Sequence, residues 1–218
     1  MKRKDILNES QRLRMLEFAG VNTVANSNFI SVDIQPAYEQ AFTFNIYDFT
    51  KFLNENYESM RSLTFLFNGP DLGFPDENEY RYWLYEKGLE EEVLDFANFF
   101  DKGYAFFRTC MDEGAEEEEI VNLIKFMLQH NINDSRDLED REMWDEFMKE
   151  YGYDEADVRD ILEYTGNVLH IPELMEYLEN YNDNIVLTGG GINECLKEVE
   201  IALKALNKPY KVYPRYMY

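Results

Sequence analysis

Short apolar runs rich in β-branched and aromatic residues alternate with amphipathic helical patterns along this chain, and the alternation constrains the fold more than any other feature. The runs that predict strands lie at 29–33, 63–67, 96–100, 185–188 and 210–213. The helical patterns between them fall at 47–60, 77–96 and 193–206. Strands that alternate with helices pair in parallel and are covered on both faces. The sequence therefore predicts a doubly wound α/β domain with a mostly parallel sheet.

One long stretch interrupts this rhythm. Residues 111–181 are acidic, contain no good strand pattern and carry several amphipathic helical stripes. A chain of 218 residues can hold one large domain with an insertion of this size. We therefore expect an N-terminal arm at 1–27, an α/β core built from 28–110 and 182–218, and an acidic helical insertion or lid between the two halves of the core.

The charge balance limits the classes of partner. The chain has 44 acidic and 21 basic residues, which gives a formal net charge of −23. Such a field repels nucleic acid, because phosphate binding relies on Lys and Arg, and it disfavours anionic membrane surfaces. We interpret the acidity as a solubility device and expect neither nucleic acid nor a membrane as partner.

The cysteine content and the start of the chain bear on location. There are two cysteines, Cys110 and Cys195, too few for a disulfide framework. The basic residues after Met1 are not followed by an apolar run, so the sequence shows no signal peptide or membrane-spanning pattern. These features predict a reducing, cytoplasmic location. Cys110 is interpreted as a small buried residue.

Three reactive side chains follow predicted strands. Asp33 closes the first strand, Lys102 follows the third, and Cys195 follows the glycine turn after 185–188. In open α/β sheets, ligands bind beyond the carboxyl ends of the strands. We therefore expect these three side chains to meet at one edge of the sheet despite their separation in sequence.

The surroundings of Cys195 favour nucleophilic chemistry. A thiol attacks as its thiolate, and the positive end of a helix or a nearby ammonium such as that of Lys102 lowers a thiol pKa. The glycines at 189–191 lead into the helix that carries Cys195, and their N–H groups are suited to stabilise an oxyanion. Asp33 is placed to accept the thiol proton and return it to a leaving group.

Three motifs carry a resemblance to a known family. The segment LTGGGINEC at 187–195 is similar to the nucleophile motif of the isochorismatase-like cysteine hydrolases, the superfamily that includes nicotinamidases. The segment DIQPAY at 33–38 resembles that family's Asp-x-Gln-x-x-Phe motif, and DKGYAFF at 101–107 resembles its lysine segment. The three occur in the family's order, and the resemblance extends over roughly 28–110 and 183–214, about half of the chain.

The resemblance implies a role for each reactive residue. Asp33 would be the general base, Lys102 the charge-stabilising partner and Cys195 the nucleophile of a hydrolase that cleaves the C–N bond of a small amide or a related carbonyl substrate. The family's non-proline cis peptide would fall near Gly190 and Gly191, which would contribute the oxyanion site. We expect the substrate pocket to be lined by residues that flank this triad, namely Gln35, Tyr38, Tyr104 and Phe107.

The chain also departs from the family pattern. The metal-binding Asp-x-His-x-His of nicotinamidases is absent after the second strand, where the sequence reads NGPDLG at 68–73. The two histidines, His130 and His170, lie in the insertion. We therefore expect no metal and no cofactor.

An alternative of a different class stays open. The acidic insertion and the large negative charge also fit a non-catalytic protein that reuses the fold to bind or inhibit a partner, in the manner of some viral accessory proteins. The aromatic tail at 213–218 predicts a subunit contact, and hence a homo-oligomer, because exposed apolar ends often mark interfaces.

Overall fold

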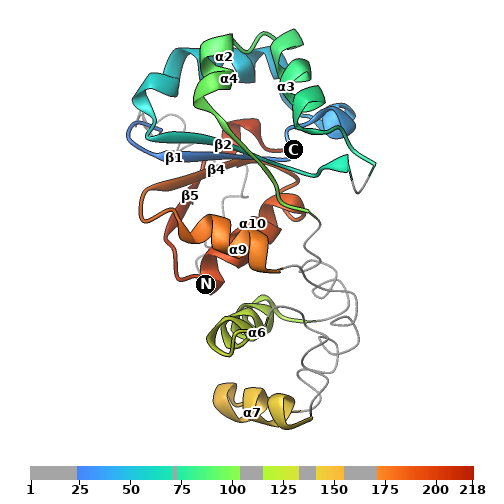
Figure 1. Cartoon of the computed structure of the whole chain (residues 1–218), viewed down its shortest axis with the longest axis vertical. Coiled ribbons are helices and arrows are strands. Elements are labelled where there is room, and N and C mark those ends of the chain that lie inside the picture. The colour runs from blue at the N-terminus through green and yellow to red at the C-terminus, as the bar shows by residue number, and fades with distance from the viewer. Residues whose placement is uncertain (1–23, 71–72, 104–114, 133–140, 155–170) are drawn as a thin grey trace, which may run out of the picture.

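The computed structural model describes residues 24–70, 73–103, 115–132, 141–154 and 171–218 (Figure 1). Five strands form one sheet in the order β3-β2-β1-β4-β5, and every neighbouring pair is parallel. The strands are β1 (Asn28–Val32), β2 (Ser62–Phe67), β3 (Asn98–Asp101), β4 (Ile185–Gly189) and β5 (Tyr210–Val212). The five predicted strands are confirmed, with the third beginning two residues later than expected.

Helices cover both faces of the sheet, which confirms the α/β class. One face carries α2 (Ile46–Asn56), α3 (Glu77–Glu86) and α4 (Glu91–Phe96), and the other carries α9 (Ile171–Glu179) and α10 (Cys195–Ala205) (Figure 1). Further elements are α6 (Glu117–Gln129), α7 (Arg141–Tyr151) and the short 3-10 helices η1 (Pro36–Ala41), η2 (Tyr57–Ser59) and η5 (Pro214–Tyr216).

The strands supply two separate apolar layers because successive side chains of a strand point to opposite faces. Phe29 of β1 packs into the layer beneath α2 and α3, which is rich in aromatic rings. Its neighbour Ile30 packs into the layer beneath α9 and α10, which is mainly aliphatic near the sheet. Both faces of the sheet are covered by helices. The strands therefore do not alternate regularly between apolar and polar residues, as expected for a parallel sheet.

The turn between β4 and α10 requires glycine. Gly189 and Gly190 have φ angles of +81° and +62°, which L-residues with a side chain rarely adopt. A Cβ at Gly189 would lie 2.3 Å from the carbonyl oxygen of Val32, and one at Gly190 would lie 2.8 Å from the amide nitrogen of Leu196. The glycines thus let β4 run close to β1 and then turn directly into α10, whose first residue is Cys195.

The described part of the insertion extends the core. Helix α6 packs against α10, and its Glu117 forms ion pairs with Lys197 and Lys204 of that helix. Phe126 of α6 and Phe147 of α7 are fully buried in the same apolar cluster as the α10 residues. Two of the helices in the insertion, α6 and α9, thus cover α10 and the sheet, and a lid function for the segment stays a prediction.

The tail at 213–218 packs on its own chain. Tyr216 and Met217 are only 1% and 7% exposed, so these two side chains pack within the chain, and a subunit contact through the tail stays a prediction. The apolar rings are buried because Tyr216 inserts between α2 residues such as Phe49 and Phe52.

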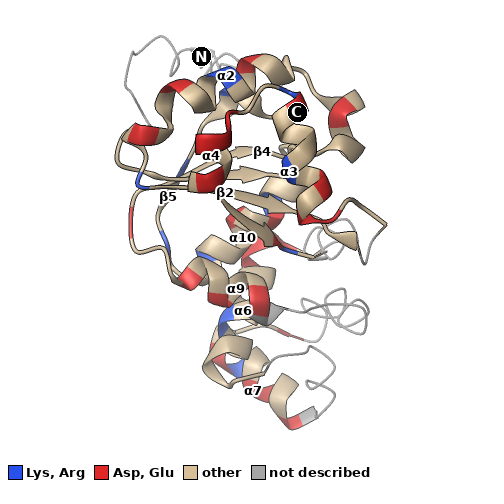
Figure 2. Cartoon of the chain, turned by 45° about the horizontal axis from the view of Figure 1, so that its top comes forward, with Lys and Arg blue, Asp and Glu red and all other residues tan. Residues whose placement is uncertain are grey.

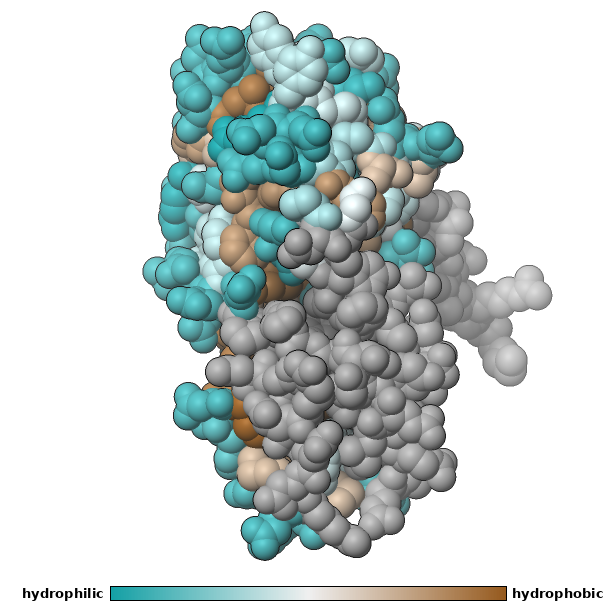
Figure 3. Space-filling view, turned by 45° about the vertical axis from the view of Figure 1, so that its right-hand side comes forward, coloured by the Kyte–Doolittle hydropathy of each residue, from teal (hydrophilic) through white to brown (hydrophobic). Residues whose placement is uncertain are grey.

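The surface is strongly acidic. Asp and Glu positions recur along α3, α4, α6, α7 and α9, with few Lys or Arg positions between them (Figure 2). On the face drawn in Figure 3, hydrophilic residues form most of the coloured surface, with narrower apolar areas between them. Of the helices that the structure describes, none has the length and apolar character needed to cross a membrane.

Candidate active site

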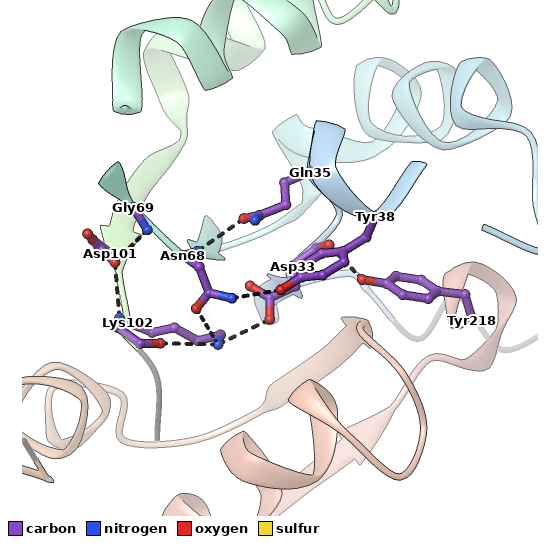
Figure 4. A network of polar contacts seen from close by, with 9 residues as sticks. Asp33, Gln35, Tyr38, Asn68, Gly69, Asp101, Lys102 and Tyr218 are labelled. Atoms are coloured by element: carbon purple, nitrogen blue, oxygen red, sulfur yellow. Dashed lines mark hydrogen bonds and ion pairs between the residues drawn. The ribbon is translucent and has the colours of Figure 1, made fainter. Parts of the chain in front are cut away.

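Asp33 and Lys102 meet at the carboxyl edge of the sheet, as predicted. Asp33 follows β1 directly, has a φ of +48° and is completely buried. Lys102 follows β3, and its amide donates to the carbonyl of Phe67 at 2.9 Å. The Lys102 Nζ lies 3.1 Å from Asp33 Oδ2, with only 4% of the lysine side chain exposed (Figure 4). The two strand ends thus form a buried ion pair.

Lys102 is held as an ammonium by this pairing. Burial by itself lowers the pKa of Lys102, but the negative charge of Asp33 and its hydrogen bond with the ammonium raise it, and the net pKa lies above its ordinary value of 10.5. The ammonium also donates to Asn68 Oδ1 at 2.9 Å and to the Gly103 carbonyl at 3.4 Å. A positive charge therefore persists at this edge throughout the physiological pH range.

Asn68 connects the pair to its neighbours, and the sequence analysis missed this role. Its side-chain Nδ2 donates to the Tyr38 hydroxyl at 3.2 Å, and its main-chain N–H donates to Gln35 Oε1 at 3.0 Å. Asn68 follows β2 and is fully buried. Because Asp33, Asn68 and Lys102 each follow one of three adjacent parallel strands, strand-end position was the signal that could have identified it.

Asp101 fixes the backbone beside Lys102. Its Oδ1 accepts hydrogen bonds from the amides of Gly69 and Gly103, both at 3.0 Å (Figure 4). A Cβ at Gly69 would lie 1.8 Å from Asp101 Oδ2, so the close approach requires glycine. The loops after β2 and β3 are thus joined, which limits the positions open to the Lys102 side chain.

Several buried polar atoms at this edge lack a hydrogen-bond partner among the described residues. They are both carboxylate oxygens of Asp33, the Nε2 of Gln35 and the Ser31 hydroxyl. The charge of Asp33 is nevertheless paired, because its Oδ2 lies 3.1 Å from the Lys102 ammonium. Buried polar atoms are nearly always satisfied in folded proteins, so those of Asp33 and Gln35 are available to a ligand.

Cys195 lies at the first turn of α10 as predicted, but the prediction that its thiol pKa is lowered is wrong. Burial, followed by the negative charge of Asp33, raises the pKa of the Cys195 thiol to about 12. The positive charge of Lys102 lowers this pKa, but its effect is smaller. Desolvation and the nearby carboxylate therefore outweigh the ammonium, and the thiol is protonated at neutral pH.

The predicted oxyanion residues Gly190 and Gly191 are buried in the turn before α10. Their carbonyls accept hydrogen bonds from the amides of Tyr218 and Glu194, at 3.2 and 2.9 Å. Their own amides donate to no group in the part of the chain that the structure describes. The described segments contain no cis peptide bond, so that part of the expectation is wrong. The oxyanion role itself stays a prediction.

Two of the four predicted pocket residues can be placed. Gln35 and Tyr38 both bond to Asn68, which accepts from the Lys102 ammonium that pairs with Asp33. Tyr104 and Phe107 lie outside the described residues. Tyr218, which the sequence analysis did not select for the site, also reaches this edge, and its hydroxyl donates to the Asp33 carbonyl at 2.8 Å. No group of three or more His, Cys, Asp or Glu within the described segments is arranged to hold a metal ion.

Comparisons of the chain with protein-family models, with curated proteins and with solved structures found no match in any of the three. The family resemblance therefore rests on the three short motifs alone. The chemistry open to the site rests on its geometry, a buried carboxylate and ammonium beside a thiol at the end of a parallel sheet.

Proposed function

We propose that this protein is a cysteine hydrolase of the isochorismatase-like kind, with Cys195 as nucleophile, Asp33 as general base and Lys102 as the charge that supports them. The observation that carries the proposal is the buried Asp33–Lys102 pair, whose charges both act on the Cys195 thiol. Buried charges are costly, and titratable groups with strongly shifted pKa values cluster at functional sites. The substrate class is a small amide or a related carbonyl compound.

The first half-reaction transfers an acyl group to sulfur. The Cys195 Sγ attacks the carbonyl carbon while its proton passes to Asp33, and the new charge on the carbonyl oxygen is stabilised by main-chain N–H groups at 190–191. The C–N bond then breaks, the leaving amine takes the proton from Asp33, and a thioester remains on Cys195.

The second half-reaction restores the enzyme. Water attacks the thioester carbonyl and gives a proton to Asp33, the C–S bond breaks, and the sulfur regains its proton as the carboxylic acid leaves. Lys102 stays an ammonium throughout, because its raised pKa keeps it charged, and it stabilises Asp33 whenever that residue is a carboxylate. Asp33 thus accepts one proton and releases one proton in each half-reaction.

The raised thiol pKa favours proton transfer during attack over a preformed thiolate. A thiol with a pKa of about 12 is almost entirely protonated at neutral pH, so the attack requires a base in contact range. Asp33 is the candidate for this role, because its charge and its side-chain hydrogen bond both act on the Cys195 thiol. General-base assistance of this kind typically accelerates a reaction by about 10²–10⁴-fold.

A panel of small aliphatic and aromatic amides tests the proposal. We expect the unmodified protein to hydrolyse at least one member, and Cys195→Ala to lose the activity by at least about a thousandfold because the acyl acceptor is removed. Asp33→Asn should lower turnover by about 10²–10⁴-fold. Cys110→Ala is the matched control and should retain activity. Turnover by Cys195→Ala at the unmodified rate would refute the nucleophile.

A second candidate function is a non-catalytic acidic binding protein. The protonated state of Cys195 and the acidic surface in Figure 2 favour it. It predicts no turnover with any amide, together with capture of a basic protein partner that is released by about 0.5 M salt, since salt screens such contacts. Hydrolysis that depends on Cys195 would exclude this alternative.

A further inference from the structure

The tail at 213–218 brings one side chain across the carboxyl edge of the sheet. Tyr216 anchors the tail in the aromatic layer above β1 and β4. The Thr43 hydroxyl donates to the Met217 carbonyl at 2.9 Å, which ties the next residue to the loop before α2. These contacts place Tyr218 at the site, although the tail follows β5, which is the edge strand on the opposite side of the sheet from β3.

Tyr218 connects the two loops that hold the base and the nucleophile. Its amide donates to the Gly190 carbonyl, and its main-chain oxygen accepts from the Ile192 amide, both at 3.2 Å. Its hydroxyl donates to the Asp33 carbonyl at 2.8 Å. Figure 4 shows the ring directed toward Asp33 beside Tyr38. One residue therefore bonds both to the turn before Cys195 and to the end of β1.

The Tyr218 ring also contributes to the burial of the site. It packs against the Phe42 ring at a centroid distance of 5.0 Å and faces Tyr38 at 6.4 Å. Burial, and then the negative charges of Asp33 and Cys195, raise the pKa of Tyr218, so its hydroxyl remains a donor at neutral pH. The ring and main chain of Tyr218 thus border both the loop that carries Asp33 and the turn that leads to Cys195.

The backbone at Asp33 explains why a tether is useful there. A φ of +48° is uncommon for a residue with a side chain and persists only where its surroundings hold it. The Asp33 carbonyl accepts from both the Gln35 amide, at 2.9 Å, and the Tyr218 hydroxyl. These two bonds fix the peptide that aims the Asp33 side chain into the site.

We propose that Tyr218 is a positioning residue that holds Asp33 and the 190–192 turn in register with Cys195, and that its ring shields the thiol from water. The inference rests on the proposed function only for the roles of Asp33 and Cys195. The geometry makes two separate claims, one for the hydroxyl as a tether and one for the ring as a shield, and each has its own variant.

The shield is tested by the pH dependence of Cys195 alkylation with iodoacetamide, followed by peptide mass spectrometry. In Tyr218→Ala, water reaches the thiol, so we expect its apparent pKa to fall by about one unit or more and alkylation at pH 8 to become at least about tenfold faster. Tyr216→Phe is the matched control, because it removes a hydroxyl from the same tail without touching the site, and it should keep the unmodified profile.

The tether is tested by hydrogen exchange in Tyr218→Phe, which keeps the ring. Loss of one hydrogen bond should make the amides at 33–35 exchange about three- to tenfold faster, with no such change in Tyr216→Phe. Neither readout requires turnover, so both remain informative if the protein proves not to be a hydrolase. An unmodified alkylation profile in Tyr218→Ala, together with unmodified exchange in Tyr218→Phe, would overturn the proposal.

Discussion

Two clusters in this molecule join carboxylates to lysines, and they differ in almost every other respect. At the sheet edge, the side chains of Asp33 and Lys102 are 0% and 4% exposed. Between α6 and α10, Glu117 pairs with Lys197 and Lys204, and these side chains are 27%, 23% and 38% exposed. Glu117 pairs with two lysines, whereas Asp33 pairs with Lys102 alone among the described residues.

The difference indicates what each cluster is for. A half-exposed pair costs little to form and contributes little, so the Glu117 cluster serves to join α6 to α10. A buried pair loses several kcal/mol of hydration for each ion, and is a poor way to gain stability. The Asp33–Lys102 pair therefore contributes little to folding, which supports the proposed chemistry at the strand ends.

Breaking each pair should give effects of very different size. Lys102→Met leaves a buried, unpaired carboxylate and should lower the free energy of unfolding by about 3–5 kcal/mol. Lys204→Met at the α6–α10 cluster should lower it by no more than about 1 kcal/mol. Urea unfolding measures both. Removing both charges in Asp33→Asn/Lys102→Met should restore most of the loss, and equal costs for the two single lysine variants would contradict the comparison.

The thiol beside the buried pair should titrate far from its ordinary range. The pKa of Cys195 is raised from 9.0 to about 12, so its thiolate fraction at neutral pH should be about a thousandfold below that of a free cysteine. Alkylation by iodoacetamide should be slower by a similar factor and rise about tenfold per pH unit up to the pKa. A rate that levels off near pH 9 would show that Lys102 outweighs burial after all.

The backbone at the sheet edge should also tolerate little change, because Gly69 and Asp101 are in close contact. In Gly69→Ala the new methyl group would meet the Asp101 carboxylate, and forcing a group into a packed position costs about 1–3 kcal/mol. Urea unfolding of Gly69→Ala, Asp101→Ala and the double variant checks the cause. Because Asp101→Ala removes the clash, the double variant should be more stable than the sum of the single effects predicts. Strict additivity would assign the cost elsewhere.

The smallest effect is expected at the half-exposed cluster. Burial raises the pKa of Glu117. The hydrogen bonds and charges of Lys197 and Lys204 lower this pKa by more than burial raises it, so the net pKa is below 4.5. The stabilisation that the Glu117 ion pairs give the folded state is therefore complete above pH 4.5. It is lost as the pH falls through the pKa of Glu117 in the folded protein. Glu117→Gln should cost less than about 1 kcal/mol at pH 7 and nothing at pH 2, as measured by thermal unfolding.

Much of the fold could be predicted from the sequence. The strand patterns are short, apolar and bounded by turn residues, so β1, β2 and β4 were placed to within one residue. The glycines at 189–191 marked the turn into α10 because only glycine adopts the required φ angles without strain. Since parallel strands end at one edge, the meeting of Asp33 and Lys102 followed from topology.

The rest of the site depends on packing that no local pattern encodes. The ionisation of Cys195 is set by its burial and by its proximity to Asp33, which only the folded chain determines. The contact of Tyr218 with Asp33 joins residues 185 positions apart, and the aromatic tail carries no signal for its partner. Asn68 begins an Asn-Gly-Pro segment, which is a strong turn signal, and that pattern does not indicate a buried side chain at the site.

The most direct test of the central claim is a crystal structure of the protein soaked with a small aldehyde. If Cys195 is a nucleophile assisted by Asp33, its sulfur will bond to the aldehyde carbon, the thiol proton will pass to the aldehyde oxygen, and density will run from Sγ into the added carbon. Ordered aldehyde elsewhere, with the Cys195 sulfur unmodified at saturating aldehyde, would contradict the account.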